Sequence, residues 1–362
     1  MKSTLPRILH IAPSNISNVP GTLVLQEREM GYDSRLLTLF ANNRGYFEDI
    51  CLHLPFIDYW GTVQIKKCFS SPRRIRLANQ PPRPQKIPLQ WHPHTRGEKW
   101  FVALRDWLWS HRIGKAIEKY DLENFDIYQL DGGLGLSRNS QFMMRMHQLG
   151  KKIICCYTGS DLRTRGVIPR IDKISQLNVT VEFDHLQLHP NMHHVFFPFH
   201  AERFSRHISN PRLVRIGHAP TNWDAKGSHT IVPVLKNLQK NWPVEMVLIE
   251  NMSHEQALAA KLGCDIFVDQ IGSLGYGINS LESLAMGIVT CSCLAPGFAE
   301  KYPHHPFVVI DENNLEEKLI DLIGAPEMRQ KLGQRGREWV KAFHDAANTV
   351  KSIHQLAGIT SI

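Results

Sequence analysis

A glycine-rich loop between a short apolar strand and a short helix carries the clearest chemical signal in the sequence. The segment 265–287 predicts a buried strand, then this loop, then a helix that begins at Ser280. The loop glycines are Gly272, Gly275 and Gly277. Ligands of parallel sheets bind at the carboxyl ends of strands, where glycines let backbone amides approach a phosphate closely. The free amides of Ile278, Asn279 and Ser280, with the helix dipole, therefore predict an anion site.

The same segment has a structural interpretation that involves no ligand. Asn279 is placed to cap the helix, and Glu282 is placed to complete a capping box with it. Leu281, Leu284 and Met286 would then be core residues. Glycine loops before helices are common, so these residues by themselves leave both interpretations open.

A second loop places a cation where it can reach the same edge of a sheet. Gly217 and His218 follow a predicted strand, and Lys226 stands two residues ahead of Ser228, where a helix is predicted to begin. A lysine on such a loop can neutralise a diphosphate. Surface loops that contain Lys-Gly are also ordinary, so this signal is weak alone.

Short apolar strands alternate with helices along most of the chain, which predicts two parallel sheets covered on both faces. The expected strands are 7–12, 34–40, 126–130, 152–157 and 179–183, then 213–216, 244–249, 264–271, 288–294 and 307–310. The expected helices are 22–30, 100–120, 228–240, 253–262, 280–286, 315–323 and 326–343. In the helix 253–262, Ser253 and Gln256 predict a capping box. We expect an N-terminal domain of residues 1–205, a C-terminal domain of residues 206–343, and a helix in 344–362 that returns to the N-terminal domain.

The positive charge of the chain is concentrated in one segment. The chain has 42 Lys and Arg against 34 Asp and Glu, a formal net charge of +8. Residues 63–119, a basic insertion that starts in Pro- and Arg-rich sequence, account for the whole excess, which indicates a local anionic partner. The predicted helix 100–120 sets tryptophans beside basic residues, a pattern that suits an anionic membrane surface as well as packing on a sheet. Nucleic acid is a competing partner, but no recognition motif accompanies the arginines.

The cysteines and histidines predict neither a disulfide framework nor a metal site. The seven cysteines form no C-x-x-C pair, which indicates a reducing compartment. The 19 histidines include adjacent pairs without cysteine partners, so we expect no bound metal. No run approaches the roughly 20 apolar residues that span a bilayer. We therefore expect a cytoplasmic protein, in peripheral contact with the inner face of the cell membrane.

The order and spacing of these motifs resemble those of a GT-B glycosyltransferase, and most closely the retaining, nucleotide-sugar-dependent bacterial enzymes of family 4. In the C-terminal half the resemblance rests on Gly217, Lys226-Gly227, 247–251, Asp265 with Asp269, and 275–287. In the N-terminal half it rests on 8–13 with Asn18, and on 157–163 and 165–166. The resemblance covers nearly the whole chain. It implies an α/β chain of two Rossmann-like, doubly wound domains that face each other across a cleft, one for the acceptor and one for the nucleotide sugar.

The resemblance also implies roles for individual residues. Glu282 would bind the ribose hydroxyls, Lys226 the diphosphate, and the amides of 277–280 the distal phosphate. The loop 250–252 would hold the base. The implied donor-binding set is Gly217, His218, Lys226, Glu250, Asn251, Met252, Gly275, Tyr276, Gly277, Ile278, Asn279, Ser280 and Glu282. The implied acceptor-side set is Asn15, Asn18, Gly21, Thr158, Gly159 and Arg163, and the implied catalytic residues are Lys226, Glu282 and Asp161.

Three positions depart from the family's pattern. Leu274 stands where the family commonly has a glutamate, and Asn222-Trp223-Asp224 stands where it commonly has an arginine. Thr158 stands where a histidine is often found. The loss of one cation from the diphosphate site would cost about 10²-fold in rate if that cation acts in the transition state. These departures support, as an alternative, a catalytically degenerate GT-B protein that binds a nucleotide or glycan and scaffolds a partner.

The expected function is the transfer of a sugar from a UDP- or GDP-linked donor to a glycan or lipid-linked acceptor, with retention, in the synthesis of a cell-surface polysaccharide or glycoconjugate. The resemblance implies no metal and no other cofactor, because lysine and helix-terminal amides would stabilise the leaving diphosphate. A further alternative is a phage-type glycosyltransferase that modifies nucleic acid.

Overall fold

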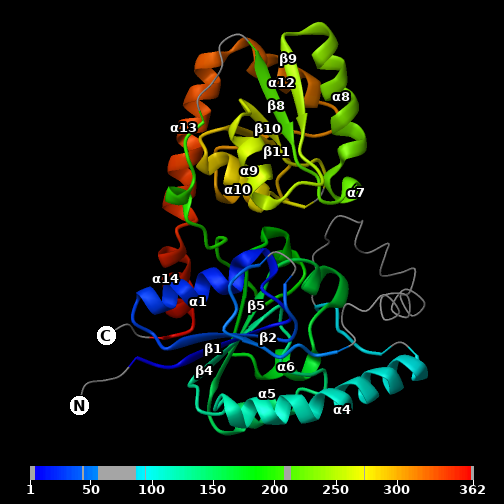
Figure 1. Ribbon diagram of the computed structural model, residues 1–362, viewed down its shortest axis with the longest axis vertical. Coiled ribbons are helices and arrows are strands. Elements are labelled where there is room, and N and C mark those ends of the chain that lie inside the picture. Colours follow the sequence, from blue (N-terminus) through cyan, green and yellow to red (C-terminus); the bar gives the residue numbers. More distant parts are fainter. Residues whose placement is uncertain are drawn as a thin grey trace. The chain divides into compact units, whose positions relative to one another are not determined.

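The chain forms two compact α/β units in the computed structural model, which describes residues 5–42, 45–55, 87–93, 95–207, 213–272 and 274–359. Unit 1 consists of Met1–Pro198 and Ala346–Ile362, and unit 2 of Phe199–Asp345. Unit 2 thus begins a few residues ahead of the linker expected near residue 205. Each unit has one parallel sheet with helices packed around it (Figure 1).

The sheet of unit 1 has seven parallel strands in the order β3-β2-β1-β4-β5-β6-β7. The strands are β1 (Ile8–Ala12), β2 (Ser34–Thr38), β3 (Ile50–Cys51), β4 (Ile127–Asp131), β5 (Lys152–Tyr157), β6 (Leu177–Thr180) and β7 (His193–His194). In the centre of the sheet His10 lies opposite Leu36 on one side and Gln129 on the other. The strand order reverses between β1 and β4, and sheets of this type bind ligands at that point, outside the carboxyl ends.

The helices of unit 1 are α1 (Val19–Glu29), α4 (Arg96–Lys119), α5 (Gln141–Gln148), α6 (Pro169–Ile174) and α14 (Ala346–Leu356). Three short helical turns, η1 (Ile16–Asn18), η2 (Asp161–Arg165) and η3 (Phe183–Gln187), lie in loops that follow strands. α4 begins at a cap in which the Thr95 hydroxyl accepts the amide of Glu98 at 3.0 Å.

A buried charged network joins β1, α1 and α14 in unit 1. The ring of His10 bonds Glu27 Oε2 at 3.0 Å and Asp131 Oδ2 at 2.9 Å, and all three side chains are buried. Burial opposes a charge on the imidazole, but the two carboxylates outweigh it and raise the pKa of His10 to about 10. His354 of α14 bonds the second oxygen of Glu27 at 2.9 Å and packs edge-on against Tyr32. This network holds the C-terminal helix on unit 1, and His10 therefore lies in the core and not at a ligand-binding edge.

The sheet of unit 2 has five parallel strands in the order β12-β11-β10-β8-β9. The strands are β8 (Val214–His218), β9 (Val244–Leu248), β10 (Ile266–Val268), β11 (Val289–Ser292) and β12 (Val308–Val309). The helices are α7 (Trp223–Lys226), α8 (Ser228–Asn241), α9 (His254–Leu262), α10 (Ile278–Ala285), α11 (Phe298–Lys301), α12 (Leu315–Gly324) and α13 (Pro326–Phe343), with a turn η4 (Ala201–Arg203). The order reverses between β8 and β10, so the ligand-binding point of this sheet is expected where those two strands end.

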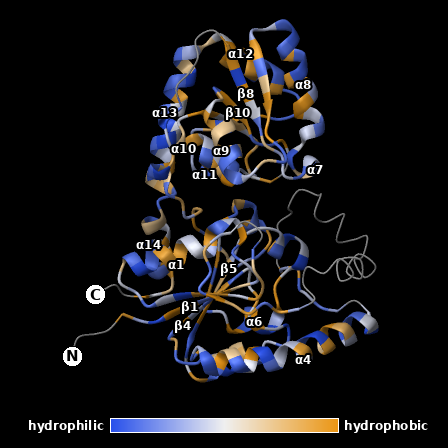
Figure 2. Ribbon diagram, in the orientation of Figure 1, coloured by the Kyte–Doolittle hydropathy of each residue, from blue (hydrophilic) through white to orange (hydrophobic). Residues whose placement is uncertain are grey.

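Hydropathy follows these layers. The strands of both sheets are largely hydrophobic, whereas α13 is mostly hydrophilic along its length (Figure 2). In unit 2 the apolar side chains of the central strands pack against α8 and α12, through residues such as Ile216, Leu235 and Leu319. Burying strands on both faces explains why they read as continuous apolar runs in the sequence.

Candidate active site

The carboxyl edge of the unit 2 sheet brings together the predicted cation and the predicted anion-binding helix. Lys226 ends α7, after β8, and its Nζ contacts Asp269 Oδ1 at 2.5 Å and Gln270 Oε1 at 2.8 Å, both after β10. The other oxygen of Asp269 accepts the hydroxyl of Ser280, in the first turn of α10, at 2.6 Å. One buried carboxylate thus holds the lysine at the helix N-terminus. Burial raises the pKa of Asp269, but Lys226 outweighs it and the net pKa is lowered, so this carboxyl is ionised.

The glycine loop leaves room beside this helix N-terminus. α10 begins at Ile278 rather than Ser280, with Gly277 as its N-cap and no side-chain cap. The amide of Ser280 donates to Gly277 O at 3.0 Å. The prediction that this amide is free is therefore wrong. The amides of Ile278 and Asn279 are ones that an α-helix leaves without intrahelical acceptors. A Cβ at Gly277 would meet nothing within 4 Å, so space lies open at this end of the helix.

The other loop residues hold the loop in place. Tyr276 is buried in an aromatic cluster with Phe298, Phe307 and Trp339, and its hydroxyl lies 3.2 Å from a ring nitrogen of His344. Leu274 supplies no carboxylate, and its carbonyl accepts the side-chain amide of Gln270 at 2.7 Å. These contacts fix the backbone that leads into α10.

Glu282 is buried between the side chains of Lys261 and His254. Its Oε2 contacts Nζ of Lys261 on α9 at 2.5 Å, and its Oε1 contacts Nε2 of His254 at 3.0 Å. Burial raises the pKa of this carboxyl, but Lys261 outweighs it, and the net pKa is lowered. Nζ of Lys261 also donates to Asn279 Oδ1 at 2.9 Å, so the side chains of Asn279 and Glu282 both contact the lysine. The prediction of a capping box between these two residues is therefore wrong. The His254 side chain is 52% exposed, which leaves this corner accessible to a ligand.

The remaining donor-side residues differ in how accessible they are. His218 is fully buried, with its ring nitrogens 2.8 Å from Val268 O and from Ser228 Oγ, and burial lowers its pKa. At Gly217 a Cβ would lie 2.8 Å from Cys264 Sγ, so packing alone requires glycine there. The indole of Trp223 donates to Glu250, in the loop after β9. Of the other two loop residues, Asn251 has a left-handed φ of 54° and Met252 is 47% exposed.

In unit 1 the loop after β1 is held by its own side chains. The amide of Asn15 donates to Asn18 Oδ1 and to Phe47 O, each at 2.9 Å, and its oxygen accepts the amide of Gly21 at 3.2 Å. A Cβ at Gly21 would overlap the Asn15 side chain. These three predicted acceptor-side residues therefore lie together at the carboxyl edge of the sheet, in a loop that they also stabilise.

The loop after β5 is organised by Asp161. Its carboxylate accepts the amides of Thr158, Gly159 and Leu162 at 2.8–2.9 Å. Such charge-assisted bonds fix the turn at the start of η2. In this geometry Asp161 is a positioning residue for the loop.

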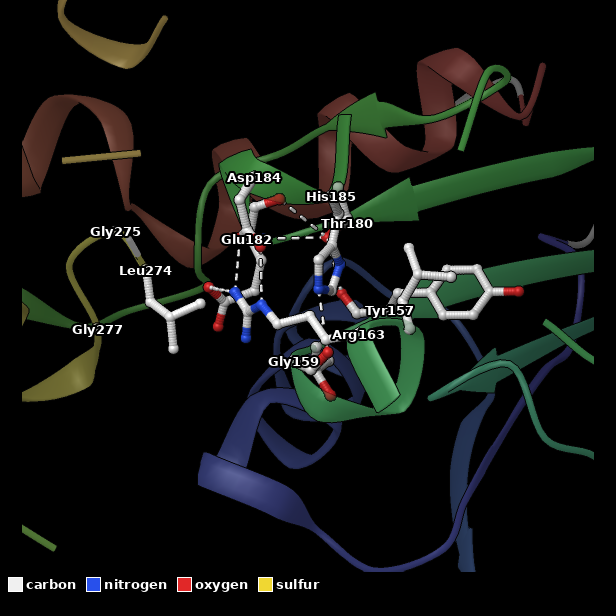
Figure 3. A network of polar contacts seen from close by, with 12 residues as sticks. Tyr157, Gly159, Arg163, Thr180, Glu182, Asp184, His185, Leu274, Gly275 and Gly277 are labelled. Carbon is white, nitrogen blue, oxygen red and sulfur yellow. Dashed lines mark hydrogen bonds and ion pairs between the residues drawn. The ribbon is translucent and has the colours of Figure 1, made fainter. Parts of the chain in front are cut away.

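Arg163 anchors a buried ionic cluster beneath that loop (Figure 3). Its guanidinium makes two bonds to Asp184, at 2.6 and 2.7 Å, and one to Glu182 at 2.8 Å. Burial raises the pKa of Glu182 to about 7 despite the arginine. His185 bonds Gly159 O at 3.0 Å and Thr180 Oγ1 at 2.8 Å, and burial lowers its pKa to about 4. A histidine thus does support this loop, but it comes from η3 and not from the position of Thr158.

The chain matches no family model, and no curated protein matches it in sequence. Solved structures match it over nearly its full length. The HepE protein of Anabaena, in complex with UDP, is 9% identical, with a TM-score of 0.56 over 98% of this chain and 100% of that one. Sucrose-phosphate synthase from Thermosynechococcus elongatus is 13% identical, with a TM-score of 0.59 over 97% and 98%. A glycosyltransferase from Rickettsia africae is 10% identical, with a TM-score of 0.56 over 98% of each.

The chain has the GT-B fold. The two parallel sheets predicted from the sequence are confirmed. At these identities the comparison shows the fold alone, so the family 4 subtype and retention of configuration stay predictions.

Part of the basic insertion of this GT-B chain, residues 63–86 and 94, lies outside the described residues. Its last part, α4, is described. Trp109 is buried and its indole donates to Pro55 O at 3.0 Å, whereas Trp100 and Trp107 are 68% and 69% exposed. Trp109 therefore packs in the core, whereas Trp100 and Trp107 do not.

Among the described residues of the GT-B chain, no group of three or more His, Cys, Asp or Glu side chains is arranged to hold a metal ion. None of their helices is both long enough and apolar enough to cross a bilayer.

Sequence analysis missed two functional-site candidates, Lys261 and Glu182. Lys261 lies in a helix with little amphipathic pattern, and it is 1% exposed where its Nζ contacts Asn279 and Glu282 of α10. Glu182 follows a short strand, and nothing local indicates that it joins Arg163. A charged residue at a position that the helical or strand period assigns to the core is the sequence feature that could have indicated both residues.

Proposed function

We propose that this GT-B chain is a glycosyltransferase that moves a sugar from a UDP- or GDP-linked donor to a glycan or lipid-linked acceptor, with retention, in cell-surface polysaccharide or glycoconjugate synthesis. The HepE structures contain UDP, or UDP-glucose, which is consistent with a nucleotide-sugar donor. The proposal assigns donor binding to unit 2 and acceptor binding to unit 1.

One observation carries the proposal. At the switch point of the unit 2 sheet, the carboxylate of Asp269 holds Lys226 at the N-terminus of α10, beside the open space at Gly277. A lysine and a helix N-terminus in one place form a site for a diphosphate. Glu282, four residues into α10 from Ile278, is the proposed ribose partner, next to the exposed His254.

In the proposed reaction the C1–O bond to the diphosphate breaks and a bond forms between C1 and the acceptor oxygen on the same face. The acceptor proton passes to an oxygen of the leaving diphosphate, so the products are a nucleoside diphosphate and the glycosylated acceptor. Lys226 and the first-turn amides of α10 would stabilise the charge that develops on the diphosphate, which supports a metal-independent reaction. Asp269 would release part of its hold on Lys226 as the phosphate binds.

Unit 1 would supply the acceptor side through the loops after β1 and β5. Asn15, Asn18 and Gly21 shape the first loop, and Asp161 orients the amides of Thr158 and Gly159 in the second. Arg163 would act by holding the second loop on Glu182 and Asp184 rather than by contacting the sugar.

The direct test is turnover. UDP- and GDP-sugars are incubated with the full chain and an acceptor extract of the native host, and nucleoside diphosphate release is measured. Lys226→Ala is expected to lower the rate by about 10²-fold, since it removes one transition-state cation. Lys236→Ala, on the exposed face of α8, is the matched control and should leave the rate unchanged. The absence of release with every donor and acceptor pool would contradict the proposal.

A second candidate is the degenerate GT-B protein that binds donor without transferring sugar. It is favoured by Trp223, which stands where the family commonly has an arginine and whose indole bonds Glu250. This candidate predicts saturable UDP binding with no turnover, so measuring both on one preparation separates the two functions.

We also propose that the basic segment 63–119 docks the protein on an anionic membrane surface. The support within the described residues is the exposure of Trp100, Trp107 and Leu108 on the basic helix α4. Salt-sensitive binding to anionic vesicles should be weakened by Trp100→Ala with Trp107→Ala. It should also be lost when Arg73, Arg74 and Arg76 are neutralised, at positions outside the described residues. Equal binding to neutral vesicles would contradict docking, and tight binding to DNA or RNA would favour the nucleic-acid alternative.

A further inference from the structure

A cavity of about 590 Å³ lies at the amino edge of the unit 2 sheet. Its wall includes α13, from Pro326 to Lys341, and the residues directly ahead of two strands: Asp265 ahead of β10, and Met286 and Gly287 ahead of β11. Lys226 and Asp269 follow the carboxyl ends of strands in the same sheet. The cavity is therefore at the opposite edge from the proposed donor site.

Basic side chains dominate the lining of this cavity. They are Arg206, Arg329, Arg337 and Lys341. Among the described residues none of the four forms an ion pair with a carboxylate. Of the three acidic residues in the lining, Asp265 is already held by His207 at 3.2 Å and by the amide of Arg215 at 2.8 Å. Glu327 and Glu338 are the other two, so the four basic side chains leave the lining with a formal excess of one positive charge.

Arg337 has unused hydrogen-bonding capacity within this wall. One of its terminal nitrogens donates to Phe204 O at 3.0 Å and to Ala285 O, while its Nε is buried without an acceptor. Burial lowers the pKa of Arg337, and repulsion from Arg206 lowers it further. The carboxylate of Glu202 opposes this effect but does not outweigh it. A bound anion would relieve that repulsion and supply the missing acceptor.

We propose that this cavity binds a small organic molecule that carries a phosphate group. Four basic side chains in one lining suit a phosphate monoester, which is close to a dianion at neutral pH. Arginine guanidinium groups suit the geometry of phosphate oxygens. Met286 and Pro326 offer an apolar wall to the carbon body, and the volume lies within the range of small-molecule sites. The site is independent of the proposed transferase reaction.

The test is isothermal titration of the full chain with ribose 5-phosphate, with ribose as the uncharged control ligand. Arg206→Gln combined with Lys341→Gln removes two exposed cations of the lining, so the fold should be kept. The pair is expected to weaken phosphate-ester binding by at least about tenfold, because charge-assisted contacts are lost. Arg337 is left intact, since its bonds to Phe204 and Ala285 also support the fold.

Two control variants locate the binding. Arg335→Gln lies on the exposed face of α13 outside the lining, and Lys226→Ala alters the proposed donor site. Both should bind ribose 5-phosphate as the wild type does. Saturable binding that is weakened only in the Arg206→Gln, Lys341→Gln variant supports the proposal.

The following results would overturn it: no saturable binding of ribose 5-phosphate, equal binding of ribose, or binding lost in the Lys226→Ala variant. Lipid headgroups carry the same phosphate chemistry, so phosphatidylcholine vesicles with added phosphatidate form a second arm. Binding to those vesicles without binding to ribose 5-phosphate would also overturn the small-molecule site.

Discussion

At the scale of single residues, Lys261 and Glu282 form a buried ion pair beside the proposed donor site. Lys261 is 1% exposed and its charge is balanced by Glu282. Removing one partner of a buried ion pair leaves an uncompensated charge, which typically costs about 3–5 kcal/mol. Glu282→Ala is therefore expected to lower the free energy of unfolding by about that amount, as measured by urea denaturation near pH 7.

The control for this prediction is Glu312→Ala, at an exposed loop position, which should change stability by no more than about 0.5 kcal/mol. Adding Lys261→Met to Glu282→Ala removes the unpaired charge and should recover most of the loss. If Glu282→Ala is as stable as the control, the charge of Lys261 does not depend on Glu282 for its compensation, which would contradict the buried ion pair. Because Glu282→Ala is expected to lose stability, Glu282→Gln is the better variant for ligand-binding experiments.

Glu182 gives a prediction about pH. Burial raises its pKa from 4.5 to about 7 in the folded protein. Between pH 4.5 and 7 the folded state therefore binds more protons than the unfolded state, and this residue's contribution to stability falls as the pH rises. Glu182→Gln cannot lose that proton, so the variant should gain about 1–3 kcal/mol relative to wild type between pH 5 and pH 8. Urea unfolding at the two pH values measures the difference, and a constant difference would contradict the raised pKa.

Some site residues could be predicted from sequence and others could not. The loop 275–280 and Lys226 were found because glycines, a following helix and a lysine at a strand end are local signals. The partners of Glu282 were missed, since Lys261 and His254 reach it only through the packing of α9 on α10. Long-range ion pairs leave no trace in local periodicity.

At the scale of elements, the C-terminal helix α14 is tied to unit 1 by Glu27. This carboxylate bonds both His354 of α14 and the charged His10. Burial raises the pKa of Glu27, but His10 outweighs it and lowers the pKa to about 2. Glu27→Gln leaves His10 with one carboxylate and weakens the tie to α14. We expect faster hydrogen exchange of α14 amides at pH 7.

The matched control is Glu29→Gln, on the exposed side of the same helix α1. It should leave the exchange of α14 unchanged. Equal exchange in both variants would mean that α14 is held by apolar packing alone.

Most elements of unit 2 were predicted within a few residues, because its strands are buried on both faces and its helices are long. The capping box of Ser253 and Gln256 is confirmed. In unit 1 the sequence analysis missed α5, α6, β3 and β7, which are short. β3 and β7 have two residues each, which are too few for a period to show.

At the scale of the whole molecule, both units carry their candidate loops at the carboxyl edge of a parallel sheet. In unit 2 these loops follow β8 and β10, the two strands between which the strand order reverses. In unit 1 one loop follows β1, at the reversal, and the other follows β5, the neighbour of β4. The GT-B fold supplies two such edges, and only the residues at the edges decide what is bound there. Unit 2 also has a cavity at its amino edge, which the strand order does not predict.

The central claim is that the carboxyl edge of unit 2 binds a nucleoside diphosphate, and calorimetric titration with UDP and GDP tests it most directly. We predict saturable binding of at least one of them, weakened about 10- to 100-fold by Lys226→Ala, the range expected when one charged hydrogen bond is lost. The Lys236→Ala control should bind as the wild type does. Binding of neither nucleotide, or equal affinity in the Lys226→Ala variant, would contradict the account.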